Sequence, residues 1–528
     1  MQSYLSLVLH AHLPFVRHPE HEKFLEENWL FEAVTETYIP LLQILEGWRR
    51  DGMTAPITLS LSPTLCSMLL DPLLQRRYER HLNSLIDLAE KEIHRTHWDR
   101  AYRELAWMYH HRFTTIRDSW DLHRGDLVAA FRKFQDEGRI EIITTAATHG
   151  LLPMMANHPP SVRAQILTAR DHYRNCFGRD PRGIWLPECA YVSGVETFLQ
   201  EANIRWFILD THGVLHARPR PRFGTFAPIY TPNGIAAFGR DYDSSRQVWS
   251  KHEGYPGDPR YRDFYRDIGF DLDFDYVRPH LPSPEARGFT GMKYYRITSV
   301  GAGEKEIYER GAALQAAAGH AQHFLDARVE QARQIAGLMD HPPLVVAPYD
   351  AELFGHWWYE GPEFLDYLAR KIVYDQKIIS LITPGEYLAK HPTNQIATPS
   401  ASSWGEEGYL RAWLNDKNEW IYPHLNVAQE RMSALAKKFS KRKSTTALQN
   451  RALKQAAREL LLAQASDWPF ILRAGTSPDY ARRRVKDHLL RFISLHDQLT
   501  ATGVDEKWLA EAESRDNLFP DVDWNYWK

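Results

Sequence analysis

Seven short apolar runs recur along the chain, and polar residues follow each of them. Most of the runs lack the apolar–polar alternation of a half-exposed strand, and this indicates strands buried on both faces, as in a parallel sheet. Ile57–Leu61 does alternate and is the weakest case. The predicted strands are Tyr4–Leu9, Ile57–Leu61, Ile140–Thr144, Gly183–Leu186, Trp206–Leu209, Leu344–Ala347 and Ile378–Ile382.

Segments with apolar residues at helical spacing separate these runs. Alternation of strands and helices predicts an α/β fold with right-handed crossovers. About seven strands fit a barrel or a near-barrel, in which the chemistry lies at the carboxyl ends of the strands. The predicted helices are Leu30–Arg50, Pro160–Phe177, Val195–Glu201 and the Ala- and Gln-rich stretch Glu304–Met339.

Two stretches and the C-terminal part depart from this alternation. Residues 68–137 are charged and helical, which predicts a helical insertion after the second strand. Residues 216–300 contain a hairpin, Phe226–Phe238, and then a long irregular stretch, Arg240–Gly269, which we interpret as an ordered lid. We therefore expect a catalytic barrel over 1–390 and a helical domain over 391–528, with helices at Leu425–Phe439, Ala447–Gln464 and Val485–Ala501.

Composition restricts the partners and the compartment. Hydrophobic residues make up 44%, charged residues 25% and the net charge is -3, so neither nucleic acid nor a membrane is an expected partner. The first residues predict a buried strand and not a signal peptide, and no stretch approaches the ~20 apolar residues that span a bilayer. Three cysteines argue against a disulfide framework and favour the cytoplasm. The 17 Trp, 25 Tyr and 23 Phe suit a large core or flat contacts with sugar rings.

Two carboxylates stand at the ends of predicted strands. Glu188 follows Gly183–Leu186, and Asp350 follows Leu344–Ala347, and aromatic residues surround both. Glycoside cleavage requires such a pair, one carboxylate to attack the anomeric carbon and one carboxylic acid to protonate the leaving oxygen. Each residue alone could instead cap the following helix. Two carboxylates at matching strand ends favour the catalytic interpretation.

The first predicted strand is followed by His10 and His12, whose side chains share one face of the strand. This spacing is also found among metal ligands. Together with His149, His212 and Asp350, the two histidines could form a mononuclear metal-dependent hydrolase site. The alternative is that they hydrogen-bond neighbouring groups or sugar hydroxyls.

The residues that could carry chemistry fall in five short stretches. In order along the chain, these stretches resemble the five motifs of glycoside hydrolase family 57, and more narrowly those of its 1,4-α-glucan branching enzymes. The resemblance covers nearly the whole chain, and its third and fourth motifs are specific. The stretches are His10-Ala11-His12-Leu13-Pro14, Thr148-His149-Gly150, Trp185-Leu186-Pro187-Glu188-Cys189-Ala190-Tyr191, Ala347-Pro348-Tyr349-Asp350-Ala351-Glu352-Leu353-Phe354-Gly355 and Ser403-Trp404-Gly405.

The resemblance implies a fold and an activity. The family fold is an incomplete (β/α)7 barrel, related to the TIM barrel, with a helical C-terminal domain. Glu188 would be the nucleophile and Asp350 the proton donor and base of a retaining transfer from α-1,4-glucan to a 6-hydroxyl. No cofactor or metal is implied, and the protein would be a monomer or a small homo-oligomer. An α-amylase or a 4-α-glucanotransferase of the same family is the alternative; a glucan-binding scaffold without activity is disfavoured because both carboxylates are present.

The resemblance also implies residues that bind the glucan. A lid tyrosine is expected to favour transfer over hydrolysis, and Tyr242 fits by its distance from the nucleophile, with Tyr255 as the rival. Thr476 stands where the family often has a glutamine. The other residues expected to contact the glucan are His10, His12, His149, Arg266, Gly288 or Gly291, Trp404, Trp413 and Asp467.

Overall fold

A computed structural model of the protein describes residues 2–250, 253–283, 285–298, 305–441 and 444–528. All seven predicted strands occur, and the hairpin adds two more. No described helix has an apolar stretch long enough to cross a bilayer. The strands are β1 (Ser3–Ala11), β2 (Ile57–Leu61), β3 (Ile140–Ile143), β4 (Gly183–Ile184), β5 (Trp206–Leu209), β6 (Ile229–Tyr230), β7 (Ala236–Gly239), β8 (Leu344–Asp350) and β9 (Ile379–Leu381).

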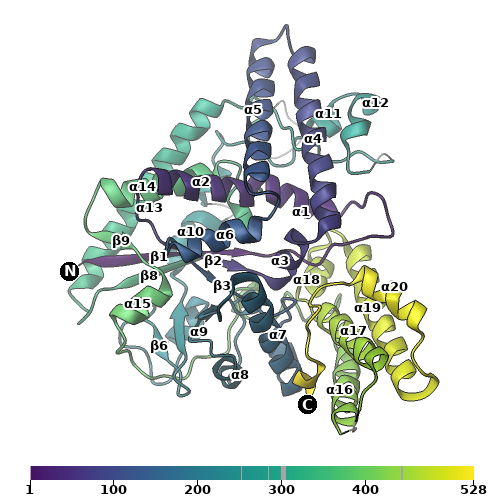
Figure 1. Ribbon diagram of the computed structural model, residues 1–528. Coiled ribbons are helices and arrows are strands. Elements are labelled where there is room, and N and C mark those ends of the chain that lie inside the picture. Colours follow the sequence, from purple (N-terminus) through teal and green to yellow (C-terminus); the bar gives the residue numbers. More distant parts are fainter. Residues whose placement is uncertain (1, 251–252, 284, 299–304, 442–443) are drawn as a thin grey trace.

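Strand β1 is the centre of the larger sheet (Figure 1). It is buried along nearly its whole length and pairs in parallel with β2, β8 and β9, which explains why its sequence does not alternate. The register places His10 opposite Ser60 of β2 and opposite Asp350 of β8. Strand pairing therefore brings the first and the fourth motif side by side.

The smaller sheet contains β4, β5, β7 and β6 in that order, and a single parallel bridge between Thr144 and Ile184 joins it to the larger sheet. β7 pairs in parallel with β5 and antiparallel with β6, so the second arm of the predicted hairpin is also a strand of the barrel wall. On the other side, Asp241 donates its backbone N–H to the carbonyl of Val346 in β8 at 2.9 Å. The described strands thus curve around a common interior without closing into one continuous sheet.

Helices cover the outside of these strands. The predicted helix Leu30–Arg50 begins earlier, at Glu27, and contains a π-helical turn. The predicted helix Glu304–Met339 begins only at Arg310, because Ile307 pairs with Tyr295 instead; Glu304 lies outside the described residues. These helices are α1 (Glu27–Ala33), η1 (Val34–Tyr38, the π-helix), α2 (Ile39–Arg50), α3 (Pro63–Leu69), α7 (Pro159–Phe177), α8 (Val195–Glu201), α9 (Thr211–Leu215), α13 (Arg310–Ala336), α14 (Gly361–Tyr374) and α15 (Pro384–Lys390).

The helical insertion between β2 and β3 is present. Its helices are α4 (Pro72–Arg95), α5 (Arg100–Leu122) and α6 (Leu127–Asp136), and each begins after an aspartate whose carboxylate accepts backbone N–H groups of the first turn. α4 and α5 stand side by side and project beyond the barrel (Figure 1).

The lid segment is more regular than its sequence suggests. Part of the stretch Arg240–Gly269 is helical, because Asp241 caps α10 (Tyr242–Trp249) by accepting the backbone N–H of Ser244 at 2.8 Å. Two further short helices follow, α11 (Ile268–Asp271) and α12 (Phe274–Val277). The expectation of a wholly irregular lid was therefore wrong at α10.

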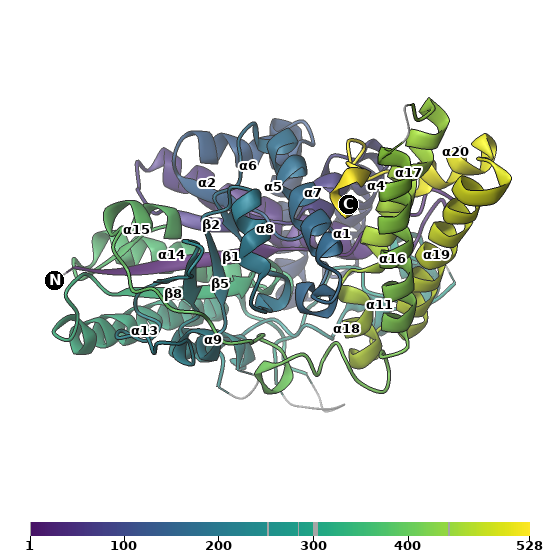
Figure 2. The same cartoon turned by 90° about the horizontal axis from the view of Figure 1, so that it is seen from below.

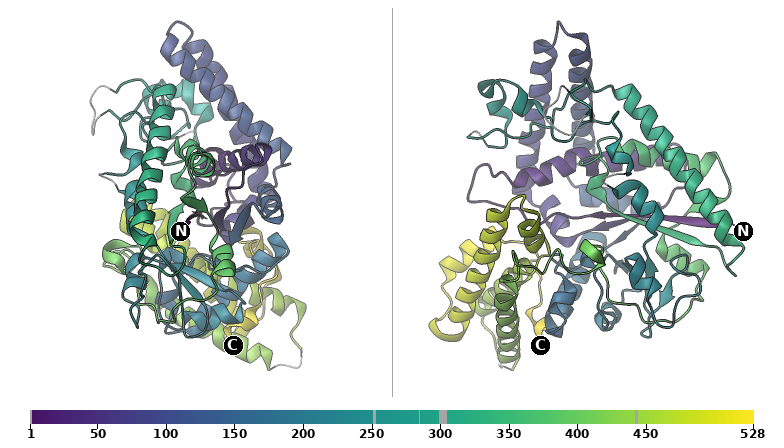
Figure 3. Two further views of the ribbon diagram at one scale, coloured as in Figure 1. Left: turned by 90° about the vertical axis from the view of Figure 1, so that its left-hand side faces the viewer. Right: turned by 180° about the vertical axis from the view of Figure 1, so that it is seen from behind.

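Helices gather at the end of the molecule opposite the N-terminus (Figure 2), beside the barrel (Figure 3, right). The three helices predicted there are present, and α18 and α20 were not predicted. The boundary near residue 390 stays a prediction. The helices are α16 (Ile421–Ser440), α17 (Ala447–Ala463), α18 (Asp467–Ala474), α19 (Pro478–Asp497) and α20 (Glu506–Arg515).

Gly355, just after β8, holds the catalytic end of this strand against the π-helix η1. Its φ is +123°, and a Cβ built there would lie 1.9 Å from the carbonyl oxygen of Glu36. We therefore predict that Gly355→Ala lowers the free energy of unfolding by about 2 kcal/mol or more. The measurement is the midpoint of thermal or urea unfolding.

The matched control is Gly319→Ala, in the middle of α13, where no atom lies within 4 Å of the added Cβ. This change should stabilise the protein by about 0.5–1 kcal/mol, because alanine is the better helix former. Equal midpoints for the two variants would contradict the packing described at Gly355.

Candidate active site

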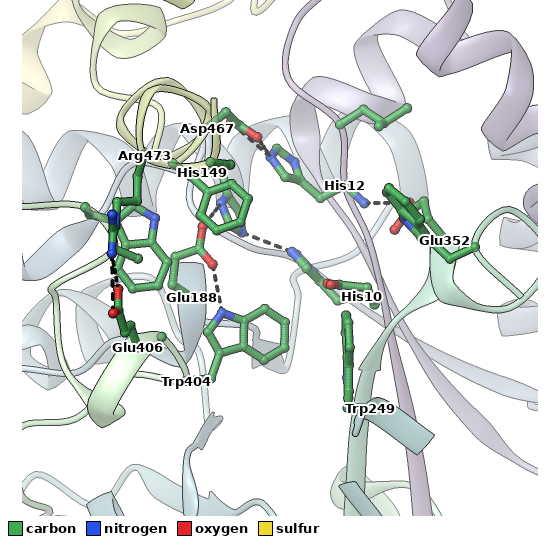
Figure 4. Close-up of a pocket in the computed structure, with 18 of the residues that line it drawn as sticks. His10, His12, His149, Glu188, Trp249, Glu352, Trp404, Glu406, Asp467 and Arg473 are labelled. Atoms are coloured by element: carbon green, nitrogen blue, oxygen red, sulfur yellow. Dashed lines mark hydrogen bonds and ion pairs between the residues drawn. The ribbon is translucent and has the colours of Figure 1, made fainter. Parts of the chain in front are cut away.

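A cleft of about 660 Å³ opens at the carboxyl ends of β1, β4 and β8. Its walls come from these strand ends, from the loop around Trp404, from α10 and from α18 (Figure 4). The predicted residues that line it are His10, His12, His149, Glu188, Asp350, Trp404, Trp413 and Asp467.

Glu188 follows β4 in a strained backbone conformation. Its φ is +63°, in the left-handed region that few residues other than glycine adopt, and such strain is concentrated at functional sites. The indole N–H of Trp404 donates to Oε2 at 2.8 Å, and the Ser466 hydroxyl donates to Oε1 at 2.8 Å. Burial raises the pKa of Glu188, and these two hydrogen bonds oppose that rise by stabilising the carboxylate.

Asp350, the last residue of β8, has a different environment. No side-chain hydrogen bond to its carboxyl group occurs among the described residues. Burial raises the pKa of Asp350 well above its usual range, and the carboxylates of Glu352 and Glu188 raise it further, while Arg240 lowers it. When two neighbouring acids have such different surroundings, the one without donors keeps the proton. This difference is the one that the roles expected from the sequence require, with Asp350 as the acid and Glu188 as the carboxylate.

Glu352 is a third carboxylate at the cleft, and its role was not predicted from the sequence. It accepts the backbone N–H of His12 at 3.1 Å and the hydroxyl of Tyr38, which belongs to the π-helix η1. Burial raises the pKa of Glu352, and these hydrogen bonds lower it. The carboxylates of Glu352 and Glu188 both raise the pKa of Asp350, and Glu352 has the larger effect.

A chain of hydrogen bonds ends at Glu188. Ser60 contacts Nδ1 of His10 at 2.9 Å, Nε2 of His10 contacts Nε2 of His149 at 3.0 Å, and Nδ1 of His149 contacts the Ser466 hydroxyl at 2.7 Å. Burial lowers the pKa of both histidines well below the usual value, and the neighbouring His12 lowers it further, so both rings are neutral. A neutral His149 that donates to Ser466 leaves the serine hydroxyl proton for Glu188.

His12 is held differently. Its Nε2 lies 3.1 Å from Asp467, and its Nδ1 lies 2.9 Å from the Ser62 hydroxyl (Figure 4). Burial by itself would lower the pKa of His12, but the ion pair with Asp467 and the nearby carboxylates raise the pKa above the usual value. The neighbouring carboxylates of Asp467, Glu352 and Glu188 therefore favour the positively charged form of His12.

The metal-ligand set considered from the sequence is assembled only in part, because His10, His12, His149 and Asp350 line the cleft but His212 lies outside it. Within the described chain, the imidazole–carboxylate group close enough to share an ion in this cleft is His12, His149 and Asp467. The rings of His12 and His149 stack face to face, with centroids 4.0 Å apart and planes inclined by 16°. Each ring also has a protein partner for its Nε2, Asp467 for His12 and His10 for His149.

Aromatic side chains form much of the remaining wall. Trp404 and Trp413 were predicted here, although Trp413 is almost fully buried. Trp249, Trp357 and Phe470 were not predicted. Trp249 is the last residue of α10. Predicting its place at the cleft would have required helical spacing of apolar residues in the lid sequence. Ring faces of this kind pack against the apolar faces of sugars.

Several predicted residues lie outside the cleft wall. Tyr242 is 62% exposed in the first turn of α10. Tyr255 is buried. Its hydroxyl shares a hydrogen bond with Nδ1 of His323 at 2.8 Å, and its ring stacks on the ring of His320. Arg266 forms an ion pair with Asp271, and His212 contacts the carbonyl of Gly408. The residues that also lie outside this wall are Gly288, Gly291 and Thr476.

Comparison with known proteins agrees with this geometry. Residues 6–400 match the model of glycosyl hydrolase family 57, and residues 424–527 match the model described as 1,4-alpha-glucan branching enzyme, C-terminal. The chain is 34% identical to the 1,4-alpha-glucan branching enzyme TK1436 of Thermococcus kodakarensis, over 99% of this chain and 78% of that protein.

Two crystal structures are similar over the full length. The alpha-amylase AmyC of Thermotoga maritima is 42% identical, with a TM-score of 0.94 and coverage of 100% of this chain and 99% of that one. The branching enzyme of Pyrococcus horikoshii is 33% identical, with a TM-score of 0.89 and coverage of 100% and 97%.

The role of Glu352 leads to a test by pH. Asp350 must be protonated to donate, so activity is lost as the pH rises through its pKa. Glu352→Gln removes a negative charge that raises this pKa but keeps an oxygen for Tyr38 and His12. We predict that the basic limb of the kcat/KM profile moves to lower pH.

Glu406→Gln is the matched control, because Glu406 lines the same cleft but pairs with Arg473 at 3.0 Å and is not among the groups that shift the pKa of Asp350. Its basic limb should stay in place. A limb that moves to higher pH in Glu352→Gln, or that moves equally in both variants, would refute the role given to Glu352.

Proposed function

The chain belongs to glycosyl hydrolase family 57, and from this membership we propose that it is a 1,4-α-glucan branching enzyme. Such an enzyme cuts an α-1,4 linkage and joins the released segment to a 6-hydroxyl of a glucan. The observation that carries the proposal is that the segment matching the branching-enzyme C-terminal model contributes directly to the cleft. Its helix α18 supplies Asp467, Phe470 and Arg473 to the wall.

The first half of the reaction uses the different states of the two acids. The Glu188 carboxylate attacks the anomeric carbon, and the C–O bond to the leaving segment breaks. Asp350 gives its proton to the leaving oxygen, so the departing chain leaves with a neutral 4-hydroxyl. The donors Trp404 and Ser466 hold Glu188 in place for the attack.

The second half returns both acids to their starting states. Asp350, now ionised, takes the proton of the incoming 6-hydroxyl, and the oxygen attacks the anomeric carbon of the glycosyl-enzyme. The bond to Glu188 breaks and the carboxylate is regenerated. Two displacements at the same carbon retain its α configuration.

Hydrolysis is the second candidate function, and the 42% identity to a protein described as an alpha-amylase favours it specifically. Both reactions share the glycosyl-enzyme and differ only in the acceptor, which is either water or a glucan hydroxyl. The exclusion of water from the cleft therefore decides the product.

Trp249 is our candidate for the lid residue that controls this choice. Its helix α10 is fixed at the other end, where Asp241 pairs with Arg328 at 3.1 Å and Tyr349 donates to the carbonyl of Ser244 at 2.9 Å. Tyr349 directly precedes Asp350, so α10 is attached to the catalytic strand itself. In the view of Figure 4, Trp249 and Trp404 both lie below Glu188 and His10.

Other features of the proposal concern substrate and compartment. An α-1,4-glucan such as amylose or a glycogen-like polymer is the proposed substrate. A cytoplasmic location and a monomer or small homo-oligomer complete the proposal; the three cysteines are free thiols in the structure, as a reducing compartment requires.

The function is tested with amylose. After incubation, a debranching enzyme releases the α-1,6-linked chains, which are counted against the free reducing ends formed before debranching. We predict many more new branches than new reducing ends, and no loss of activity in EDTA. Reducing ends alone would establish hydrolysis, redistribution of α-1,4 chain lengths without branches would establish 4-α-glucanotransfer, and loss of activity in EDTA would restore the metal-dependent alternative.

The same assay tests the lid. Trp249→Ala removes the ring that shields the cleft, so we predict that the ratio of reducing ends to branches rises several-fold. Tyr242→Ala is the matched control on the exposed face of the same helix and should leave the ratio unchanged. If the ratio of reducing ends to branches rises in Tyr242→Ala and stays unchanged in Trp249→Ala, then Tyr242 and not Trp249 is the lid residue that favours transfer.

A further inference from the structure

A second cavity, of about 620 Å³, lies at the opposite end of the barrel from the active site. Three segments enclose it: 221–229 before β6, 340–341 before β8, and 390–395 after α15. β8 runs from this cavity to the cleft, and its six residue steps separate Leu344 from Asp350 by about 20 Å. The two sites are therefore distinct, as the positions of α15 and α18 in Figure 1 illustrate.

The walls of this cavity are fixed in advance. The backbone N–H of Arg222 donates to Oε1 of Gln395 at 2.9 Å, and the Gln395 amide donates to the carbonyl of Arg220 at 2.9 Å. The backbone N–H of Leu344 donates to the carbonyl of Phe226 at 2.9 Å, which ties this wall to the start of β8. Hydrogen bonds thus join the first segment to the third and to the start of β8, and the cavity has a size that suits an organic ligand and exceeds a simple ion.

The charge at the rim is positive. Arg222 is exposed and lies 3.7 Å from Asp340, whose carboxylate is also shared with Nδ1 of His341 at 2.6 Å. Lys390 lies over the ring of Tyr4 and has no carboxylate partner among the described residues. Just outside, Arg218 and Arg220 are likewise exposed and unpaired within the described chain. The cationic side chains at and beside the rim therefore outnumber its acidic side chain, Asp340.

The interior offers both a ring face and unused polar groups. Phe223 lies against His341 with centroids 5.2 Å apart, and prolines form the adjoining wall. Behind this surface, Nε2 of His341, Nε2 of His391 and Oδ1 of Asn394 are buried without a hydrogen-bond partner among the described residues. These three polar atoms are available to bind a water, an ion or a ligand.

We propose that this cavity binds a phosphate ester of a sugar or a nucleoside. Arg222 and Lys390 would hold the phosphate at the rim, because guanidinium and ammonium groups are the usual protein partners of phosphate. Phe223 and the proline wall would contact the sugar or base ring. A neutral glucan has no anionic group that could pair with Arg222 and Lys390. The proposal does not depend on which reaction the cleft performs.

Isothermal titration of the full chain at low salt tests the proposal with four probes: glucose 6-phosphate, ADP, orthophosphate and maltoheptaose. We expect saturable binding of glucose 6-phosphate or ADP, tighter than that of orthophosphate, and the tighter ester identifies the sugar or the nucleoside as the source. The variant Arg222→Ala/Lys390→Ala should weaken that binding by about tenfold or more, the loss expected when charge-assisted contacts are removed.

The matched control is Arg100→Ala/Lys441→Ala, which removes the same charges from exposed positions on α5 and after α16, far from the cavity. This control should bind the ester like the wild type, and activity on amylose should be unchanged in both double variants. The proposal is overturned if neither ester binds, if both double variants bind equally, if orthophosphate binds as tightly as the esters, or if maltoheptaose is the probe whose binding Arg222→Ala/Lys390→Ala removes.

Discussion

The contacts of Ser466 and Asp467 with the barrel are the interaction on which the active site depends. Ser466 donates to Glu188, its backbone N–H donates to the carbonyl of His149 at 3.0 Å, and Asp467 pairs with His12. These three barrel residues, His12, His149 and Glu188, belong to the first, second and third motifs. The C-terminal helices therefore complete the surroundings of the nucleophile, and the barrel without them would lack one donor to Glu188 and the counter-charge of His12.

This docking also explains how two acids in one cleft take different states. Burial raises the pKa of both Glu188 and Asp350. Among the described residues, Trp404 and Ser466 donate to Glu188 while no side chain donates to Asp350, and the nearby Glu352 raises the pKa of Asp350. The π-helix η1 contributes at a distance, because Tyr38 fixes Glu352 and the carbonyl of Glu36 contacts Gly355. Protonation is thus set by hydrogen bonds that originate in parts of the chain far apart in sequence.

The sequence predicted the elements that carry a local signal. The seven buried strands, the helical insertion and the pair of Glu188 and Asp350 follow from apolar runs and the polar residues after them. Residues that act through tertiary contacts gave no such signal. Trp249 reaches the cleft because the Asp241 cap makes a helix within a stretch predicted to be irregular, and Glu352 gains its role from Tyr38, 314 positions away. Tyr255 carries a plausible motif, but its packing on His320 holds it in the core.

In the proposed reaction, Glu188 attacks the anomeric carbon while Asp350 holds the proton. This assignment is tested most directly with 5-fluoro-α-glucosyl fluoride, a donor that forms the glycosyl-enzyme faster than it is released. Mass spectrometry of the intact protein and of its peptides locates the adduct. The account predicts one fluoroglucosyl group, attached to Glu188 and absent from Glu188→Gln. An adduct on Asp350, or consumption of substrate with inversion and no adduct, would contradict it.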